Sequence, residues 1–300
     1  MYILIIDEVH NALIDTLSKA NHKLNYQPKI NATQVISIIS EYDGVIIRSK
    51  MKITSEVIDA AKNLKIIVRA GAGYDNIDLA AATEKGVVAM NTPGQNSNAV
   101  AELAIGMIVY IARGLFNGKA GTELKGKTIG IHAYGNVGKL VGDIAKGFGM
   151  TVAAFDPFVE REVIEADGVK VFNSAEELYS NCQYISLHIP ANDKTKESIN
   201  YKLLNRMPKG ATLVNTARKE VVNEDELVKL MTDREDFKYV SDITPNNANE
   251  LFDKFEGRVY FSPRKMGAQT SEANINAGIA AATQIVNFLE NGDTTFQVNK

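Results

Sequence analysis

The sequence has a single cysteine, Cys182, and no long hydrophobic run. One thiol excludes an intrachain disulfide and is typical of a reducing compartment, so we expect a cytoplasmic protein. The longest strongly apolar run, Leu103–Ala112, has ten residues, about half of the ~20 that a membrane-spanning helix needs. The first ten residues, MYILIIDEVH, lack the basic region of a signal peptide and reach Asp7 early, so they predict a buried strand.

Glycine and proline are also few, 22 and 7 of 300 residues, which excludes a collagen-like or low-complexity chain. The formal charge is only −3, so no overall basic field favours nucleic acid, and any anion must be bound by a local cluster. We expect neither nucleic acid nor membrane as a partner, and no metal site. At about 150 residues per domain, the length predicts two domains.

Short apolar runs alternate with helix-like spacing along the whole chain, which predicts parallel sheets with helices on both faces. The runs that predict strands are Tyr2–Ile6, Gly44–Ile47, Lys65–Val68, Val87–Met90, Thr128–His132, Thr151–Phe155, Tyr184–His188, Ala211–Asn215, Lys238–Ser241 and Val259–Phe261. We therefore expect an α/β protein with two Rossmann-like, doubly wound domains.

Two turn-rich segments divide this series. Residues 91–96 precede a helical pattern from about Asn98 to Arg113, and Ser262-Pro263-Arg264 precedes another, Thr270–Glu290. If the last helix returns to the first block, residues 1–95 with 270–300 form one domain and residues 96–269 the other. The active cleft is then expected between them.

Residues 128–138, TIGIHAYGNVG, combine a strand-like run, a tight turn and the start of a helix. They match the dinucleotide-binding fingerprint except that Ala133 replaces its first glycine, a change that requires only that φ stay negative at this turn. Gly135 lets the backbone approach a pyrophosphate, and Gly138 allows close packing of the helix against the strand.

The predicted helix begins at Asn136 and Val137, whose N–H groups and positive dipole end favour phosphate. Asp156 follows Gly138 by 18 residues and ends the next apolar run. An acidic residue there accepts hydrogen bonds from the adenosine ribose and repels a 2′-phosphate, which favours NAD over NADP. The alternative is an ordinary strand-to-helix turn with a solvated aspartate that binds nothing.

Three further segments follow predicted strands: Asn215-Thr216-Ala217-Arg218, His188-Ile189-Pro190 and Gly71-Ala72-Gly73-Tyr74-Asp75-Asn76. With the fingerprint, they resemble the D-2-hydroxyacid dehydrogenases, and within that family the 3-phosphoglycerate dehydrogenases, over nearly the whole chain. The resemblance implies an NAD-dependent oxidoreductase in which residues 1–95 with 270–300 bind the substrate and residues 96–269 bind NAD. The further NAD contacts that it implies are His188, Pro190, Thr195, Thr216, Ala217, Asp242, Gly267 and Ala268. For His188, a structural role is the alternative.

The resemblance assigns Arg218 to the substrate. A planar guanidinium can bind the carboxylate of a 2-hydroxy acid and polarise the keto oxygen of the product. A surface or helix-capping arginine is the alternative.

The family usually carries a histidine, paired with a glutamate, shortly before the final helix; this chain departs from that pattern. Alignment on Gly267-Ala268 places Lys265 there, and alignment on Pro263 places Arg264 there. We choose Lys265 as the catalytic base, because arginine does not deprotonate in proteins. No glutamate occurs in residues 241–246, and a lysine needs no carboxylate to select a tautomer.

A free lysine has a pKa of about 10.4. Burial and a nearby Arg218 would both lower the pKa of Lys265, and its ammonium form is a ready proton donor for the reverse reaction. The alternative is a surface lysine on a loop that crosses the domain hinge.

Cationic side chains also follow the second and third predicted strands. Arg48, Ser49 and Lys50 end one, and Arg69 ends the next. These groups suit a phosphate better than a methyl or phenyl group, although some of them could merely solvate loops. The N–H groups of Gly71, Ala72 and Gly73 are expected to bind the carboxylate, as the corresponding loop does in the family.

Together these observations predict oxidation of 3-phospho-D-glycerate to 3-phosphohydroxypyruvate, the first step of phosphorylated serine biosynthesis. One alternative is a family member acting on hydroxypyruvate, glyoxylate or lactate-type acids, and another is a non-catalytic NAD(H)-sensing protein. The chain ends near the end of the family's catalytic unit, so serine feedback is not expected. The apolar segment Leu103–Ala112 suggests a homodimer, although an ordinary buried helix explains it almost as well.

Overall fold

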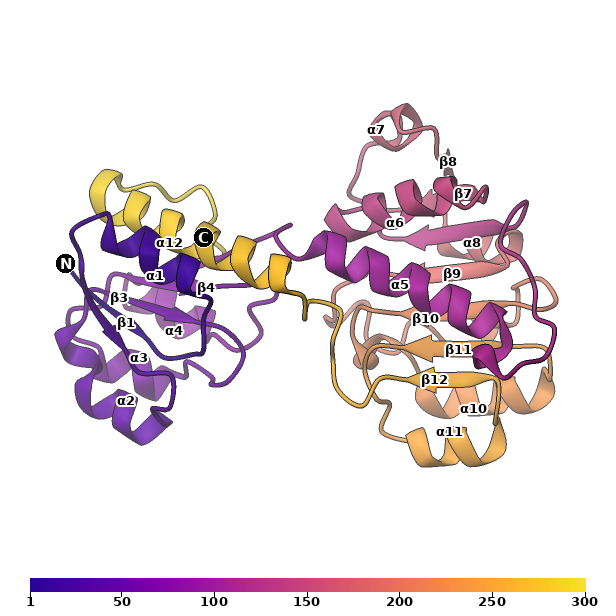
Figure 1. Cartoon of the computed structure of the whole chain (residues 1–300), viewed down its shortest axis with the longest axis horizontal. Helices are drawn as coiled ribbons and strands as arrows, with labels where there is room; N and C mark the ends of the chain where they lie inside the picture. The colour runs from indigo at the N-terminus through magenta and orange to yellow at the C-terminus, as the bar shows by residue number, and fades with distance from the viewer. The chain divides into compact units, whose positions relative to one another are not determined.

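The computed structural model describes all 300 residues, and the chain divides into two units. The first comprises Met1–Asn96 and Gln269–Lys300, and the second Ser97–Ala268. Each is built on one parallel sheet with helices packed on both faces (Figure 1). The predicted fold class, two Rossmann-like α/β domains, is confirmed.

The first unit has a five-stranded sheet in the order β2-β1-β3-β4-β5. Its strands are β1 (Tyr2–Ile5), β2 (Lys23–Tyr26), β3 (Gly44–Ile47), β4 (Ile66–Arg69) and β5 (Val88–Asn91). Its α-helices are α1 (Asn11–Ser18), α2 (Ala32–Ile38), α3 (Ser55–Ala60), α4 (Leu79–Glu84) and α12 (Ser271–Asn291). A 3₁₀ turn, η1 (Ile39–Glu41), follows α2. The chain reverses direction across the sheet between β1 and β3, which is where open α/β sheets bind ligands.

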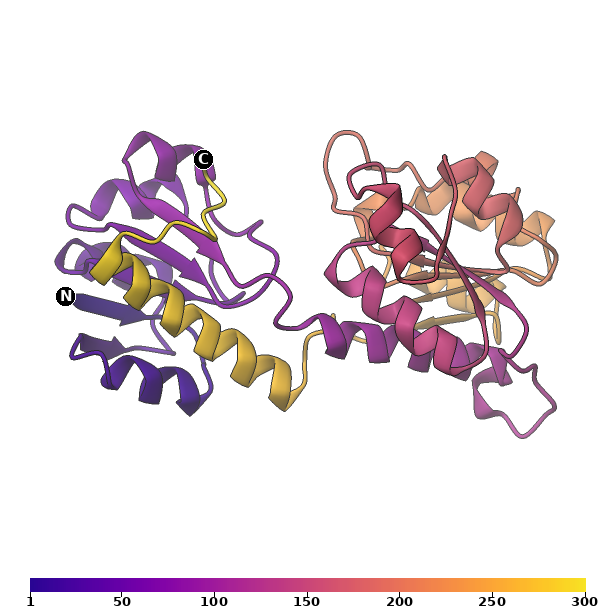
Figure 2. The same cartoon turned by 90° about the horizontal axis from the view of Figure 1, so that it is seen from above.

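The two faces of this sheet are covered by different helices. Ile3, Ile5 and Ile46 point to the face that α1 and α12 cover, while Leu4 and Val45 point to the face that α2, α3 and α4 cover. Figure 2 shows α12, in yellow, running along its side of the sheet. This alternation follows from the two-residue period of a strand, so each strand is buried on both faces.

The second unit has a seven-stranded sheet in the order β12-β11-β10-β9-β6-β7-β8. Its strands are β6 (Thr128–His132), β7 (Thr151–Phe155), β8 (Lys170–Val171), β9 (Tyr184–Leu187), β10 (Thr212–Asn215), β11 (Lys238–Ser241) and β12 (Val259–Phe261). Its helices are α5 (Ser97–Ala112), α6 (Asn136–Gly147), α7 (Arg161–Ala166), α8 (Ala175–Asn181), α9 (Tyr201–Leu204), α10 (Glu224–Asp233) and α11 (Ala248–Lys254), with 3₁₀ turns η2 (Gly114–Phe116) and η3 (Lys219–Val221).

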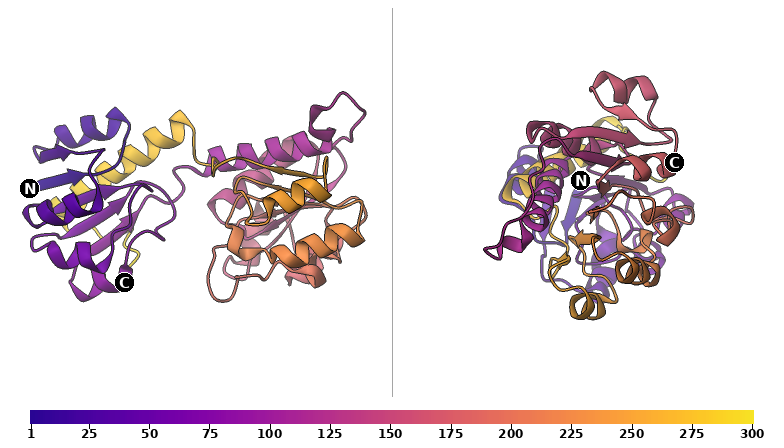
Figure 3. Two further views of the ribbon diagram at one scale, coloured as in Figure 1. Left: turned by 90° about the horizontal axis from the view of Figure 1, so that it is seen from below. Right: turned by 90° about the vertical axis from the view of Figure 1, so that its right-hand side faces the viewer.

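In this unit, α5 and α6 pack on one face of the sheet, and α8 to α11 pack on the other. Figure 3 shows α5 and the pair α10 and α11 on opposite sides of the strands. The chain reverses direction between β6 and β9. The carboxyl ends of β6, β7, β9, β10, β11 and β12 therefore lie at one edge, beside this switch point.

The predicted strands agree with the observed ones to within a residue at each end. Two strands were missed, β2 and β8, and both lie at the edge of their sheet. β2 (KLNY) has no continuous apolar run and is exposed at both ends, and β8 has only two residues. The other two edge strands, β5 and β12, keep apolar runs and were predicted.

The apolar side chains of α5 lie mainly within the core of their own unit; among them are Ala104, Ile105, Met107, Ile108 and Ile111. The buried-helix interpretation therefore accounts for the run Leu103–Ala112, and the homodimer stays a prediction. None of the helices combines the length and hydropathy that crossing a bilayer requires.

Candidate active site

The fingerprint residues form the turn between β6 and α6. Gly135 is the N-cap of α6, and a Cβ built on it meets no atom within 4 Å, so its backbone is open to approach. A Cβ on Gly138 would lie 2.3 Å from the carbonyl oxygen of Ala133. The turn therefore tolerates only glycine at position 138 and leaves open space beside Gly135. The N–H groups of Asn136 and Val137 lie in the first turn of α6, where they have no partner four residues earlier in the helix.

Asp156 lies beside this turn, directly after β7. Its carboxylate accepts hydrogen bonds from the backbone N–H groups of Tyr134 and Phe158, each at 2.8 Å. The hydroxyl of Tyr134 in turn donates to Asp167 at 3.2 Å. Since each carboxylate oxygen has two lone pairs, Asp156 can accept further hydrogen bonds from a ligand while it remains fixed.

Ala133 does not adopt the negative φ that the sequence suggested. Its φ is +80°, the region that the family's glycine would occupy without strain. The neighbouring hydrogen bonds impose this value: the Ala133 N–H donates to the carbonyl of Phe155 at 2.9 Å, and the next N–H donates to Asp156. Replacement of the first glycine by alanine therefore keeps the turn and adds strain to it.

We expect Ala133→Gly to raise the free energy of unfolding by about 1 kcal/mol, because removing the Cβ relieves more strain than glycine loses in the unfolded chain. Urea denaturation measures the change. Ala153→Gly in β7 is the matched control and should lower stability, since its alanine is a buried strand residue. A loss of stability in Ala133→Gly similar to that of the control would contradict the strain assignment.

The segment after β9 carries three of the predicted cofactor residues. The ring Nε2 of His188 lies 2.9 Å from Ser186 Oγ, and the hydroxyl of Thr195 donates to the Pro190 carbonyl at 2.5 Å. Burial, with a smaller contribution from His132, lowers the pKa of His188 to about 3. His188 is therefore neutral at physiological pH and has a structural partner, Ser186, near the end of β9.

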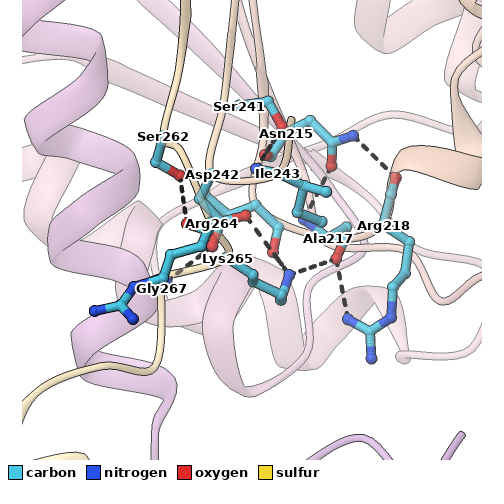
Figure 4. A network of polar contacts seen from close by, with 11 residues as sticks. Asn215, Ala217, Arg218, Ser241, Asp242, Ile243, Ser262, Arg264, Lys265 and Gly267 are labelled. Carbon is cyan, nitrogen blue, oxygen red and sulfur yellow. Dashed lines mark hydrogen bonds and ion pairs between the residues drawn. The ribbon is translucent and has the colours of Figure 1, made fainter. Parts of the chain in front are cut away.

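Arg218 follows β10 and lies at the carboxyl edge of the sheet (Figure 4). Asn215 holds this turn: its side-chain amide donates to the Arg218 carbonyl at 2.9 Å, and its Oδ1 accepts from the Ala217 N–H at 2.9 Å. The guanidinium Nη1 of Arg218 donates to the Ala217 carbonyl at 3.0 Å. Thr216 and Ala217, both predicted to contact NAD, lie within this turn and are buried.

Lys265 reaches the same carbonyl from the loop after β12. Its Nζ lies 2.9 Å from the Ala217 oxygen and 3.4 Å from the Thr216 oxygen. In Figure 4 the Arg264 side chain points away from this cluster. Of the two alignments that the sequence left open, the structure brings Lys265, and not Arg264, to Arg218.

A carboxylate faces Lys265, although residues 241–246 contain no glutamate. Asp242 follows β11 and is fully buried; its Oδ1 lies 3.5 Å from Lys265 Nζ, and its Oδ2 accepts from the Gly267 N–H at 2.8 Å. The side chain of Asn246 does not take this place, since its Oδ1 accepts from Lys219 Nζ at 2.6 Å.

The local environment shifts both ionisable partners toward their neutral forms. Burial lowers the pKa of Lys265 below that of a free lysine; Asp242 acts in the opposite direction, and Arg218 lowers the pKa further. Burial also raises the pKa of Asp242, against the effect of Lys265 and the Gly267 N–H. The side chain of Lys265 as a whole is 44% exposed, while its Nζ is held by the Ala217 carbonyl and faces Asp242.

The first unit places Arg48 and Lys50 at its own switch point, after β3. Asp7, after β1, accepts hydrogen bonds from the backbone N–H groups of both residues. The Arg48 guanidinium donates to the Glu8 carbonyl at 3.1 Å and to the Asn274 side chain. This guanidinium is held by two elements beside the strand end, and Ser49 between the two residues is exposed.

Lys50 differs from its predicted role. Its Nζ donates to the carbonyls of Ile6 at 3.0 Å and of Pro28 and Ile30 at 2.7 Å each. All three N–H donors of the ammonium are directed at backbone oxygens. Lys50 therefore ties the ends of neighbouring segments together, and the geometry does not support it as a phosphate ligand.

Arg69 and the loop after β4 form a close unit. A Cβ on Gly71 would lie 1.6 Å from Arg69 Nη1, and Gly71 has a φ of +152°. Glycine is therefore required where the guanidinium folds over the loop. The Ala72 carbonyl accepts from Asn91 at 2.5 Å, which fixes the loop that carries Ala72 and Gly73 beside Arg69.

Three residues that position these groups were missed in the sequence: Asp7, Asn215 as an anchor, and Asp242 as the partner of Lys265. Each is a polar residue that lies at the end of a buried strand or within two residues after it. That placement is a usable signal, because carboxyl ends of parallel strands meet at one edge.

Comparison with known proteins identifies the family. Residues 3–299 match the family described as D-isomer specific 2-hydroxyacid dehydrogenase, catalytic domain. The chain belongs to this family. The recognition made from the strand-end motifs is confirmed.

Two dehydrogenases of this family show how similar the chain is to its relatives. The crystal structure of NAD⁺-bound 3-phosphoglycerate dehydrogenase from Entamoeba histolytica is 44% identical, with a TM-score of 0.91, over 100% of this chain and 99% of that chain. The D-3-phosphoglycerate dehydrogenase of Methanocaldococcus jannaschii is 33% identical over 94% of this chain and 56% of that protein. The chain thus spans about half the length of the curated relatives that it matches.

A more distant structure belongs to an enzyme with a different named activity. A glyoxylate reductase from Paecilomyes thermophila is 26% identical, with a TM-score of 0.85, over 99% of this chain and 98% of that chain. Family membership alone therefore leaves the choice of 2-hydroxy acid to the side chains of the site.

Proposed function

We propose that this dehydrogenase uses NAD to interconvert 3-phospho-D-glycerate and 3-phosphohydroxypyruvate, the first step of phosphorylated serine biosynthesis. The observation that carries the proposal is the meeting of Arg218 and Lys265 on one carbonyl, that of Ala217, at the carboxyl edge of the seven-stranded sheet. Oxidation of a 2-hydroxy acid requires a cation that binds the carboxylate and a base that accepts the hydroxyl proton. Arg218 and Lys265, whose pKa is lowered, lie side by side and can supply these two groups. The E. histolytica 3-phosphoglycerate dehydrogenase, 44% identical over the whole chain, supports the same choice.

The second unit has the features that a dinucleotide needs. The open backbone at Gly135, the close packing at Gly138 and the fixed carboxylate of Asp156 would hold the pyrophosphate and the adenosine ribose. The first N–H groups of α6, at Asn136 and Val137, would receive the phosphates. Bound NAD would supply the hydride acceptor. The assignment of residues 96–269 to the cofactor and of residues 1–95 with 270–300 to the substrate is part of this proposal.

Further residues are proposed to bind the nicotinamide end because they line the ends of β9, β10, β11 and the loop after β12. They are His188, Pro190, Thr195, Thr216, Ala217, Asp242, Gly267 and Ala268. The hydroxyl of Thr216 supports this assignment, because it is buried and has no hydrogen-bond partner in the protein.

Arg218 binds the substrate carboxylate and polarises the oxygen on C2. Its planar guanidinium matches a carboxylate in a way that an ammonium does not. Lys265 moves the proton: its neutral amine accepts the hydroxyl proton during oxidation, and its ammonium returns a proton to the same oxygen during reduction. The lowered pKa of Lys265 increases the share of neutral amine, which is the form that oxidation requires.

Arg48, Ser49, Arg69 and the loop Gly71-Ala72-Gly73 are proposed to bind the acid and its phosphate. Arg48 is held by the carbonyl of Glu8 and by Asn274, and Arg69 is folded over Gly71. Two oriented guanidinium groups favour a phosphorylated acid over an uncharged side chain. Lys50 is left out, because its ammonium already binds three carbonyls.

The test compares keto acids in the direction of reduction. We expect NADH consumption with 3-phosphohydroxypyruvate to have a kcat/KM at least about tenfold above that with hydroxypyruvate, glyoxylate or pyruvate, since each lacks the phosphate and its charge-assisted hydrogen bonds. Preference for hydroxypyruvate or glyoxylate would overturn the phosphate assignment. Binding of NADH without turnover of any acid would instead indicate an NAD(H)-sensing protein.

A further inference from the structure

Asp242 contacts the lysine loop, residues 262–268, at two points. Its Oδ2 accepts the Gly267 N–H at 2.8 Å, and its Oδ1 lies 3.5 Å from Lys265 Nζ. The two contacts are two residues apart on the loop, so one carboxylate fixes both the backbone and the amine. The carboxylate itself is fixed at the end of β11, where the Asp242 N–H donates to the Asn215 carbonyl at 3.2 Å.

The local sequence is adapted to this close contact. A Cβ on Gly267 would lie 2.7 Å from Asp242 Oδ2, so only glycine lets the loop approach the carboxylate. Asp242 Oδ1 is buried and accepts no hydrogen bond. Because a buried charge is costly unless it is paired, the ammonium of Lys265 is the group that compensates it.

We propose that Asp242 is the positioning residue of Lys265, which orients its amine beside Arg218 and stabilises its ammonium form in place of the family's glutamate. The catalytic consequence rests on the proposed function, whereas the pairing itself does not. Three charges act on this amine from neighbouring elements: Asp242 after β11, Arg218 after β10 and Glu220 in η3.

The sign of the expected change follows from these charges. The Asp242 carboxylate favours the ammonium and raises the pKa of Lys265, whereas burial and Arg218 lower it. Removing the carboxylate leaves burial and Arg218 opposed only by Glu220, the smallest of these contributions. The pKa of Lys265 must then fall further, and proton donation by Lys265 should be lost at a lower pH than in the wild type.

Asp242→Asn tests this on the full chain, because its amide oxygen can still accept the Gly267 N–H while the charge is gone. Trace acetylation of Lys265, followed against pH by mass spectrometry, measures the midpoint at which the amine becomes reactive. We expect the midpoint to fall by about one pH unit or more, as for the loss of an opposite charge at this distance. Glu220→Gln is the matched control, because Glu220 is exposed and is screened by water and salt. In this variant the labelling midpoint of Lys265 should fall by less than half as much as in Asp242→Asn.

Equal midpoints in the wild type and Asp242→Asn would overturn the proposal. If Asp242→Asn does not fold, Lys265→Met allows the reciprocal measurement: carboxyl NMR should show the pKa of Asp242 raised by about one unit, because its cation is lost. An unchanged carboxyl pKa would equally overturn the pairing.

The activity readout separates the pairing from the proposed function. In the pH profile of keto acid reduction, the alkaline limb should move in Asp242→Asn to lower pH by the same amount as the labelling midpoint. A merely structural change would lower the rate at every pH and leave the limb in place. If the wild-type protein reduces no keto acid, the proposed function fails, while the labelling and NMR measurements still decide the pairing.

Discussion

Lys265→Met should lower kcat for keto acid reduction by about two to four orders of magnitude, the contribution typical of a positioned acid or base. Methionine has a similar length and no proton to move, so the loss should fall on the chemical step. The affinity for NADH should stay nearly unchanged, because the fingerprint turn and Asp156 belong to β6, α6 and β7, whereas Lys265 follows β12. Steady-state kinetics and a fluorescence titration with NADH measure the two quantities.

Arg264→Met is the matched control for this variant. It removes a neighbouring cation from the same loop, and in Figure 4 the Arg264 side chain points away from the cluster. The Arg264 backbone carbonyl, which accepts from Ser262 at 2.9 Å, is kept. Turnover close to that of the wild type in Lys265→Met would remove this lysine from the mechanism, and a large loss in Arg264→Met alone would restore the alternative alignment.

Arg218→Lys should lower kcat/KM for the keto acid by about 10² to 10³, the range for loss of one group that stabilises charge in the transition state. The positive charge is kept, but the planar fork that binds a carboxylate at two points is lost. KM for the keto acid should rise as well, since the same contact is made in the ground state. NADH binding by the variant serves as the check that the second unit is intact.

Arg206→Lys provides the comparison, because Arg206 is exposed on the segment between α9 and β10, at the opposite edge of the sheet. Its kcat/KM should match the wild type. Arg218→Lys with a kcat/KM within about twofold of the wild type would show that charge alone, and not the shape of the guanidinium, serves the substrate.

Most of the fold could be predicted because its strands are buried on both faces. A strand such as β3 (Gly44–Ile47) is apolar along its whole length, so its sequence alone predicts it, and its bounds agree with the prediction. The edge strands β2 and β8 could not be found in this way, because their exposed sides require no apolar residues. The fingerprint turn was equally readable, since close packing requires glycine at 138 whatever the rest of the chain does.

The candidate site was readable only in part. Arg218 and Lys265 could be selected by residue type and by their place after predicted strands, and the structure brings them to one carbonyl. The roles of Lys50 and Asp242 could not be selected in the same way. Lys50 is of a residue type that often binds anions, but its ammonium donates to three carbonyls from other segments.

The sequence by itself determined the alternation of strands and helices, the glycines of the fingerprint and the residue types available at the strand ends, because each depends on local period or local sterics. The tertiary structure alone decided the positive φ of Ala133, the binding of the Lys50 ammonium to three carbonyls, and the pairing of Asp242 with Lys265. Each of these depends on which strands are neighbours in the sheet. Strand order is set by packing across the whole unit, and no local pattern of residues specifies it.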